Sequence, residues 1–527
     1  MTAGTIEAPL APGSRDDQRF PTLTAEQIAR VAVHGRTRRV TQGEVLVEAG
    51  DQQFPFFLVT SGQIEIVRPA GTSEARIVVH HAGQFTGEVN MLAGRRAFAR
   101  TRVAESGEVI QLERDQLLTL VQTDSELSEI LMRAFILRRV ELITHGYGDV
   151  VLIGSTHCAG TLRVKEFLTR NGHPYSSIDL DHDEGVQDLL DRFGISEADV
   201  PVLICRGTVV LRSPSNQEIA DCLGFNAAID ETRLRDVVIV GAGPAGLAAA
   251  VYAASEGLDV LVLESSAPGG QAGASSRIEN YLGFPTGVAG YELAARAYNQ
   301  AQKFGAQIVV AKEAKRLTCD RTPYAVEMDD GVRIPARTVI IATGAEYRRL
   351  PLPNLSQFEG AGIYYSATYM ESQLCRGEEV IVVGAGNSAG QAAVFLAQTA
   401  SRVHMLVRSA SLSDSMSRYL VRRIEQNPNI ERHTHAEIVG LEGTTHLERV
   451  LWREKQTGVV EACNIRHVFT MTGAAPSTKW LEDCVALDHK GFIKTGADLT
   501  HDDLAAAEWP LPRAPHFLET SLPGVFA

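Results

Sequence analysis

Asp236-Val-Val-Ile-Val-Gly-Ala-Gly-Pro-Ala-Gly246 is the stretch of sequence that decides the fold. The apolar run Val237–Val240 predicts a strand buried in a parallel sheet, because a sheet covered on both faces shows no alternation of apolar and polar residues. Gly241, Gly243 and Gly246 follow at the spacing that permits a tight turn, close approach of a pyrophosphate and close packing of the next helix. The stretch therefore predicts a dinucleotide-binding βαβ unit.

Neighbouring segments support this prediction. A small-residue helix is expected over Leu247–Ala254, and a second strand ends at Glu264, where an acid accepts hydrogen bonds from ribose hydroxyls. A second copy of the pattern follows, in which the apolar strand Glu379–Val383 precedes Gly384-Ala-Gly386-Asn-Ser-Ala389. Two such units in one chain predict two redox nucleotides in one catalytic unit.

Length and composition limit the classes of function. The 527 residues predict three or four domains, and a net charge of −14 without a long basic tract argues against nucleic-acid or membrane partners. Residues Met1–Phe20 predict a disordered tail rather than a signal or anchor. Seven scattered cysteines without a Cys-x-x-Cys pair predict reduced thiols in a cytoplasmic protein, and we expect no metal site.

The first domain is expected over residues 21–146. Short apolar segments between turn residues predict strands at Gly43–Val47, Phe57–Val59, Gln63–Val67, Arg76–Val79 and Glu108–Leu112. A helix that begins at Asp115 or Thr123 and ends at Ile143 should follow. The region is therefore expected to form a small β-barrel with helices.

Four short motifs in this region resemble those of the cyclic nucleotide-binding domain: Gly43, Gly50-Asp51, Phe57-Leu-Val-x-x-Gly62 and Phe85-x-Gly87-Glu88. The resemblance implies that Gly87 and Glu88 contact the ligand, Glu88 at the ribose 2′-hydroxyl. The family's phosphate arginine, however, falls at Ala97, and Arg95 and Arg96 precede it as substitute donors. We expect a retained scaffold or a domain for another ligand.

A second domain is expected over residues 147–226. The expected elements, in chain order, are Val150–Gly154, a helix Thr161–Asn171, Ser177–Leu180, a helix Glu184–Phe193 and Val202–Cys205. This order and Asp199-Val200-Pro201 resemble the thioredoxin and glutaredoxin fold, which implies a cis proline. Cys158 stands alone where that family has Cys-x-x-Cys, at a helix N-terminus that favours its thiolate. Cys158 is a candidate catalytic monothiol, and a docking domain is the alternative.

After a linker over residues 227–235, the chain resembles the thioredoxin reductase family. The motifs Gly269-Gly-Gln271, Ile278–Phe284 and Val339–Gly344 carry this resemblance. It implies two Rossmann-like three-layer α/β domains, one for FAD over 236–350 and 472–527 and one for NADPH over 351–471. It also implies a homodimer.

The resemblance assigns cofactor contacts residue by residue. The residues implied for FAD are Gly241, Gly243, Pro244, Ala245, Gly246, Glu264, Gly270, Gln271, Asn280, Ala342, Thr343 and Gly344. Those implied for NADPH are Gly384, Gly386, Asn387, Ser388, Ala389 and Arg408. Arg408 follows the strand Val403–Val407 where an acid would select NAD, so it favours NADPH through the 2′-phosphate. The family has His-Arg-Arg at this place, whereas this chain has Val407-Arg408-Ser409. Because one arginine remains, the expected preference for NADPH over NADH is weaker.

Two departures from the family affect the expected activity. Tyr365-Ser-Ala-Thr-Tyr369 stands where the family has Tyr-Cys-Ala-Thr-Cys, so both redox sulfurs are replaced, and Cys375 is interpreted as structural. The segment Glu519–Ala527 leads into the family's last FAD motif, Ala-Gly-Asp, which does not follow Ala527 in this sequence. We therefore expect a C-terminally incomplete FAD domain, with weakened FAD binding, or a fragment of a longer chain.

Three hypotheses for function follow. The first is an NADPH-dependent FAD oxidoreductase that passes electrons directly to an external small-molecule or protein acceptor. The second makes Cys158 a relay in the same chain and retains disulfide reductase activity. The third is a non-catalytic redox or ligand sensor.

Overall fold

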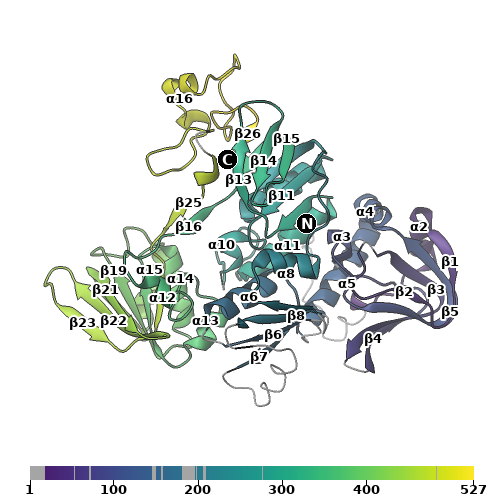
Figure 1. Cartoon of the computed structure of the whole chain (residues 1–527), viewed down its shortest axis with the longest axis horizontal. Helices are drawn as coiled ribbons and strands as arrows, with labels where there is room; N and C mark the ends of the chain where they lie inside the picture. The colour runs from purple at the N-terminus through teal and green to yellow at the C-terminus, as the bar shows by residue number, and fades with distance from the viewer. Residues whose placement is uncertain are drawn as a thin grey trace, which may run out of the picture.

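The computed structural model describes residues 18–527 except 53, 71–72, 89, 145–149, 156–157, 181–195, 197–198, 206–208, 276 and 482–483. Figure 1 shows four sheet-containing parts: an N-terminal one at the right, a small one below the centre, one above the centre that holds the C-terminus, and one at the left. Most of the tail expected at Met1–Phe20 lies outside the described residues.

The barrel module (18–144) is an antiparallel sheet with helices at one end. Its strands are β1 (Arg36–Val40), β2 (Val45–Val47), β3 (Phe56–Ala70), β4 (Ser73–His80) and β5 (Arg100–Leu112), in the order β1-β5-β3-β4 with β2 on β5. Its helices are α2 (Ala25–His34), α3 (Asn90–Ala93), α4 (Arg114–Thr123) and α5 (Ser125–Thr144). Phe56, Phe85 and Phe135 pack against one another in the core.

Two expectations for this module are wrong in detail. The strands expected at Phe57–Val59 and Gln63–Val67 are one strand, because β3 stays paired with β5 through three register irregularities between residues 59 and 64. The single expected helix is two, because Asp124 ends α4 and its side chain accepts a hydrogen bond from Leu127 N (3.0 Å), which starts α5.

The four-stranded module (150–226) has the sheet order β7-β6-β8-β9. Its elements are β6 (Val150–Gly154), α6 (Ala159–Arg170), β7 (Ser176–Asp179), β8 (Val202–Cys205), β9 (Val209–Arg212) and α8 (Asn216–Leu223). Strand β7 runs parallel to β6, whereas β8 runs antiparallel to it. The Val200–Pro201 peptide bond is cis, as the resemblance implied. The helix expected at Glu184–Phe193 lies outside the described residues.

The first dinucleotide module (235–350 and 472–527) contains a seven-stranded sheet in the order β12-β11-β10-β15-β14-β13, with β26 on β15. Its strands are β10 (Arg235–Val240), β11 (Val260–Glu264), β12 (Gln307–Val310), β13 (Ala314–Thr318), β14 (Tyr324–Met328), β15 (Arg333–Ile341) and β26 (Val525–Phe526). Its helices are α9 (Pro244–Ser255), α10 (Gly270–Gly273), α11 (Gly290–Lys303), η2 (Lys479–Leu481), η3 (Gly496–Asp498) and α16 (His501–Ala506). Strands β10, β11, β12 and β15 are parallel, so their carboxyl ends meet at one edge.

A disulfide joins Cys319, just after β13, to Cys484, just after η2, with 6.0 Å between the Cα atoms. The expectation that all seven cysteines are reduced is therefore wrong for this pair. The two residues are 165 positions apart, and only the folded sheet brings the ends of β13 and η2 together.

The second dinucleotide module (351–471) has three layers. Its central parallel sheet consists of β17 (Ile363–Tyr364), β24 (His467–Thr470), β18 (Glu379–Val383), β19 (Arg402–Val407) and β20 (Ile430–Thr434), in that order. Helices lie on one face: α13 (Tyr369–Leu374), α14 (Asn387–Leu396) and α15 (Arg418–Gln426). On the other face lie α12 (Leu355–Phe358) and the antiparallel sheet of β21 (Ala436–Gly443), β22 (Leu447–Glu454) and β23 (Val460–Cys463).

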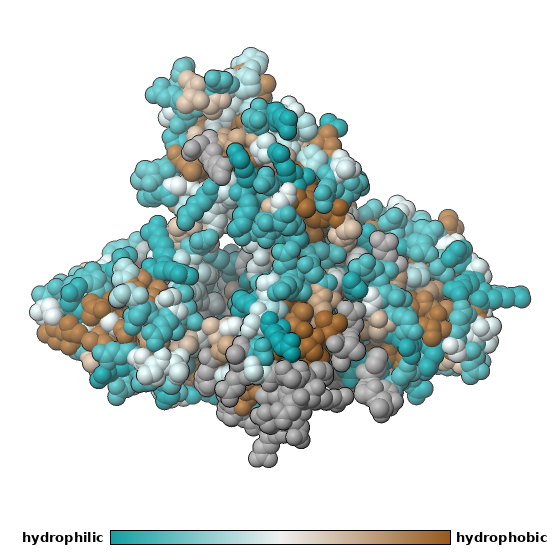
Figure 2. Space-filling view, in the orientation of Figure 1, coloured by the Kyte–Doolittle hydropathy of each residue, from teal (hydrophilic) through white to brown (hydrophobic). Residues whose placement is uncertain are grey.

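The paired strands β16 (Ala345–Tyr347) and β25 (Ala474–Pro476) connect the two dinucleotide modules. Figure 2 shows a largely hydrophilic face with scattered apolar patches. Among the described residues, none of the helices combines the length and apolarity needed to cross a membrane.

Candidate functional site

The first glycine turn joins β10 to α9. Gly241 has a φ of +105°, and a Cβ there would lie 2.2 Å from Ala342 O, so only glycine fits. A Cβ on Gly246 would lie 1.9 Å from Gly241 O, so the helix can approach the turn only without a side chain. Beside Gly243, in contrast, the nearest atom to such a Cβ is Gly270 Cα at 3.9 Å. The turn therefore leaves space at Gly243, where a pyrophosphate would approach.

The amino end of α9 is suited to an anion. Gly243 is the N-cap residue, Pro244 is in the first turn, and no described side chain caps this end. The first N–H groups of a helix have no partner within the helix, and the helix dipole is positive there. Because Ala245 and Gly246 lie in this first turn, the end of α9 can hold phosphate oxygens.

Glu264 ends β11 next to this turn. Its Oε2 accepts a hydrogen bond from Ala242 N (2.8 Å), and its Oε1 accepts one from Ser266 N (2.9 Å). Burial raises the pKa of the Glu264 carboxyl, and these hydrogen bonds act in the opposite direction. Each carboxylate oxygen can accept a further hydrogen bond, so Glu264 can brace the turn and also bind ribose hydroxyls.

The other residues implied for FAD surround the same edge of the sheet, with one exception. Gly270 lies opposite Gly243, and Gln271 Nε2 donates to Ala345 O (2.5 Å). Thr343, between Ala342 and Gly344 at the end of β15, donates its Oγ1 hydrogen to Ser477 O (2.9 Å). Asn280 is exposed in the segment between α10 and α11, and the structure gives it no hydrogen bond to the turn.

The second glycine turn joins β18 to α14. A Cβ on Gly384 would lie 3.1 Å from the Ala389 Cβ, so alanine in the third place still permits close packing of helix and strand. Gly386 is the N-cap residue of α14, again without a capping side chain among the described residues. Asn387 Oδ1 accepts a hydrogen bond from Ser417 N (2.7 Å), so this side chain braces the start of α15. Ser388 and Arg408 are exposed.

Two glycine turns, each at the carboxyl ends of parallel strands and followed by an uncapped helix, define a class of protein that binds two dinucleotides. Residues 235–506 match the family model "pyridine nucleotide-disulphide oxidoreductase", and residues 37–124 match "cyclic nucleotide-binding domain". The chain belongs to the pyridine nucleotide-disulphide oxidoreductase family. It is a thioredoxin reductase-like, FAD-dependent oxidoreductase, and this family implies FAD and NAD(P)H as cofactors.

Sequence relatives support this assignment. The chain is 31% identical over 304 residues to NADPH-dependent thioredoxin reductase 3 of Arabidopsis thaliana, a match that covers 54% of this chain and 57% of that protein. It is 35% identical over 265 residues to the thioredoxin reductase of Ureaplasma parvum, covering 50% and 84%. The crystal structure of Lactococcus lactis thioredoxin reductase is similar at a TM-score of 0.49 and 26% identity, covering 56% of this chain and 89% of that one.

The segment that replaces the family's dithiol lies between β17 and α13. Tyr365 donates to Glu359 Oε1 (2.5 Å) and stacks on Tyr347, with 6.1 Å between the ring centroids. Ser366 is half-buried. The nearby Cys375 is fully buried, and burial raises the pKa of its thiol to about 12. A neutral, enclosed thiol cannot replace the missing redox sulfurs.

Cys158 is the N-cap residue of α6 and is half-buried. A Cβ on Gly160 would lie 2.9 Å from Pro201 Cδ and 3.7 Å from Cys158 Sγ, so the cysteine and the cis proline lie beside the same turn of helix. The next residue, Ala159, touches the second dinucleotide module, because a Cβ on Gly360 would lie 2.8 Å from its Cβ. Leu162 packs against the core of that module. Cys158 therefore lies at the boundary of the two modules.

Arg170, at the end of α6, reaches the FAD loop and was not expected from the sequence. It donates from Nη2 to Gly270 O (2.8 Å) and Ala267 O (3.3 Å). Carbonyl oxygens on this loop are thereby satisfied by a residue from another module. No local motif marks Arg170, since its role depends on how α6 packs on the loop.

In the barrel module, Arg95 and Arg96, the possible substitutes for the phosphate arginine, are hydrogen-bonded to groups other than Glu88. Arg95 is buried and donates to Asn171 O (3.0 Å) and Tyr298 Oη (3.0 Å). Arg96 packs against Gly224 and donates to Gly50 O (3.5 Å). Glu88, next to Gly87, lies 3.7 Å from Arg139 Nη1. Arg95 is therefore bound at the interface of the barrel module with the four-stranded module and the first dinucleotide module.

Proposed function

We propose that the chain is an NADPH-dependent FAD oxidoreductase without a redox dithiol in its second dinucleotide module. The observation that carries this proposal is the pair of glycine turns combined with Tyr365-Ser-Ala-Thr-Tyr369, which contains no sulfur. Bound FAD would take up a hydride equivalent from NADPH and pass electrons to an acceptor. Gly243 and the end of α9 would hold its pyrophosphate, and Glu264 its ribose. The acceptor is a small molecule or protein outside these modules.

The choice of NADPH rests on Arg408. It follows β19 directly and is exposed, where a guanidinium can bind a 2′-phosphate.

An anaerobic titration of the purified chain tests the proposal. Excess NADPH should bleach the bound flavin, and dithionite should reduce it fully with about two electrons per FAD, without a thiolate-to-flavin charge-transfer band. A four-electron endpoint would mean that a disulfide exchanges electrons with the ring. A protein that stays colourless when given FAD would instead favour the sensor hypothesis.

A second candidate function uses Cys158 as a relay, with the four-stranded module acting as a thioredoxin-like domain. The contact of Ala159 with Gly360 supports it, because the contact brings Cys158 next to the module that normally carries the dithiol. The Cys158 thiolate would attack a small-molecule or protein disulfide, release one thiol and remain in a mixed disulfide. Two electrons and one proton, derived from the hydride of NADPH, together with a second proton from solvent would convert that bond into two thiols.

The variant Cys158→Ser separates the two candidates. NADPH oxidation is measured with ferricyanide, which needs no thiol, and with glutathione disulfide or thioredoxin. Loss of disulfide turnover alone supports the relay, whereas equal rates in the variant and the parent for every acceptor remove it. Cys463→Ser, on β23, is the matched control.

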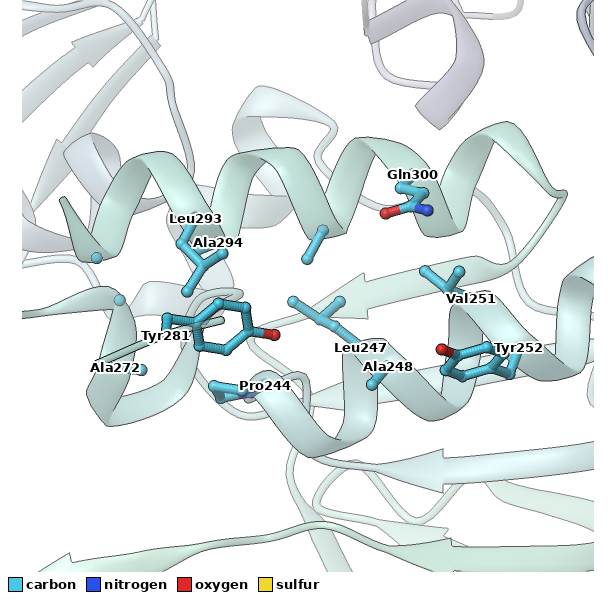
Figure 3. A pocket seen from close by; sticks show the side chains of 14 residues that line it. Pro244, Leu247, Ala248, Val251, Tyr252, Ala272, Tyr281, Leu293, Ala294 and Gln300 are labelled. Carbon is cyan, nitrogen blue, oxygen red and sulfur yellow. The ribbon is translucent and has the colours of Figure 1, made fainter. Parts of the chain in front are cut away.

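We also propose that the chain forms a homodimer through α9 and α11. A cavity of about 240 Å³ lies between these helices, and Figure 3 shows Leu247 and Val251 of α9 on one side of it and Ala294 and Gln300 of α11 on the other. Tyr252, next to it, is 75% exposed. Pro244 and Gly269, which lie beside the first glycine turn, also line this cavity, whereas the ribose-binding candidate Glu264 does not. Light scattering of Tyr252→Glu should give a monomer; an unchanged dimer would reject this surface.

A further inference from the structure

Two histidines and a glutamate gather at the edge of the second dinucleotide sheet, outside the glycine turn. Strands β19 and β20 are parallel, and His404 pairs with Glu431. Because alternate residues of a strand point to the same face, His433 lies on the same side as Glu431. Strand β20 is the last of its sheet, so the group is open to solvent on one side.

The distances within this group suit a shared metal ion. His404 Nδ1 lies 3.1 Å from His433 Nε2, and His433 Nε2 lies 3.7 Å from Glu431 Oε1. One ligand atom from each of the three residues lies within 4.8 Å of the others. Two nitrogens about 2.0–2.1 Å from one Zn²⁺ are about 2.9–3.4 Å apart at the angles of octahedral to tetrahedral coordination. The observed nitrogen separation falls in this interval.

The surroundings fix the imidazole of His404 in the orientation a ligand needs. Its other nitrogen, Nε2, lies 3.4 Å from Glu379 Oε2. A carboxylate on the far nitrogen of a ligating histidine sets the tautomer and makes the ligand more basic. Trp452, from β22, packs against both imidazoles, with 5.6 Å to the ring of His404 and 5.2 Å to that of His433.

We propose that His404, Glu431 and His433 bind one divalent first-row transition cation, for which Zn²⁺ is the best match. Two imidazoles and one carboxylate suit such cations, whereas Ca²⁺ and Mg²⁺ take oxygen ligands. Three protein ligands leave a position for water, and the half-exposed Glu431 side chain gives access to it. The sequence predicts no metal site here, because no local motif connects His404 with Glu431 and His433 on the next strand.

Calorimetry with the full chain tests the proposal after chelator treatment and dialysis. Titration with ZnCl₂ should detect a site whose affinity falls by at least about tenfold in both His433→Gln and Glu431→Gln. Both variants change partly exposed side chains, so the fold is expected to persist, and thermal unfolding checks this. His446→Gln, at the turn between β21 and β22, should bind like the parent. Equal affinity in the parent and in the two site variants would overturn the proposal.

Trp452 offers a readout located at the site itself. Ni²⁺ quenches the fluorescence of a nearby indole, so a saturable loss of emission is expected in the parent chain. That loss should be absent in Trp452→Phe, which keeps the other two tryptophans, and should require higher Ni²⁺ in His433→Gln. If quenching in Trp452→Phe equals that in the parent, the cation binds elsewhere and the proposal is wrong.

Discussion

Ala97 stands where a cyclic nucleotide-binding domain would carry the arginine that holds the phosphate. Its side chain is buried in the barrel core with Val47 and Phe57, and its backbone N–H donates to Asp51 O (2.8 Å). Arg95 is held by Asn171 and Tyr298, so turning it toward a phosphate would break two hydrogen bonds. A domain can therefore keep the fold of a family and lose the family's ligand through the change of a single residue.

We expect weak or no binding of cyclic AMP and cyclic GMP. Loss of a charge-assisted contact costs about 1.5–3 kcal/mol, which corresponds to roughly ten- to hundredfold in affinity. Calorimetry with both nucleotides measures this directly. Submicromolar binding of either one would contradict the expectation and imply that Arg95 leaves its interface.

Arg408 permits a second test at the scale of one residue. Flavin reduction should half-saturate at a lower concentration of NADPH than of NADH, because only NADPH carries the 2′-phosphate. Arg408→Ala should remove most of that difference while leaving NADH kinetics unchanged. Arg418→Ala, in the first turn of α15, is a control of equal charge change. If stopped-flow measurements give equal rates of flavin reduction by NADPH and NADH in the parent chain, the assignment of Arg408 to the 2′-phosphate is wrong.

Among the elements, the C-terminal turn depends on one carboxylate. Glu519 is buried and accepts hydrogen bonds from His516 N (2.8 Å) and Gly524 N (3.0 Å). Arg513 contributes two more, at 2.6 and 3.1 Å. The Arg513 guanidinium is the main reason that the pKa of Glu519 falls from 4.5 to about 2. This turn positions β26 against β15, the strand that leads to Thr343.

Glu519→Gln should lower the stability of the chain by about 1.5–3 kcal/mol at neutral pH, since hydrogen bonds to a charged group are lost. The folded pKa is below the unfolded value, so this contribution is present above about pH 4.5 and is lost as the pH falls toward 2. The difference in Tm between the parent and the variant should therefore shrink in acid. Glu231→Gln, exposed in the linker, should show no difference at any pH.

Across the whole molecule, α6 touches every other module. Asn171, which follows its last residue, accepts from Arg95 of the barrel module, and Arg170 binds the FAD loop at Gly270. At the other end, Ala159 meets Gly360 of the second dinucleotide module. Rotation of that module would break the last contact, which lies next to Cys158 in the chain. This arrangement gives the relay hypothesis its physical basis.

The sequence predicts features that are encoded locally. The turns at Gly241 and Gly384, the strands on either side and Glu264 follow from contiguous patterns, because sterics and strand burial act over a few residues. The contacts of Arg170 depend on packing between distant segments, as does the pairing of His404 with His433. Such contacts leave no periodic or spaced signal in one sequence, so the structure was needed to find them.

The Cys319–Cys484 bond closes a ring of polypeptide that contains the whole second dinucleotide module, residues 351–471. A backbone cut anywhere inside this ring leaves both fragments covalently attached. After limited trypsin digestion within the module, electrophoresis without reductant should show a band of nearly full size, which dithiothreitol resolves into two. Cys484→Ser should give two bands under both conditions. Two bands from the parent without reductant would show that the bond is not formed. A band of nearly full size would show that the bond keeps the fragments of a cleaved module attached to each other.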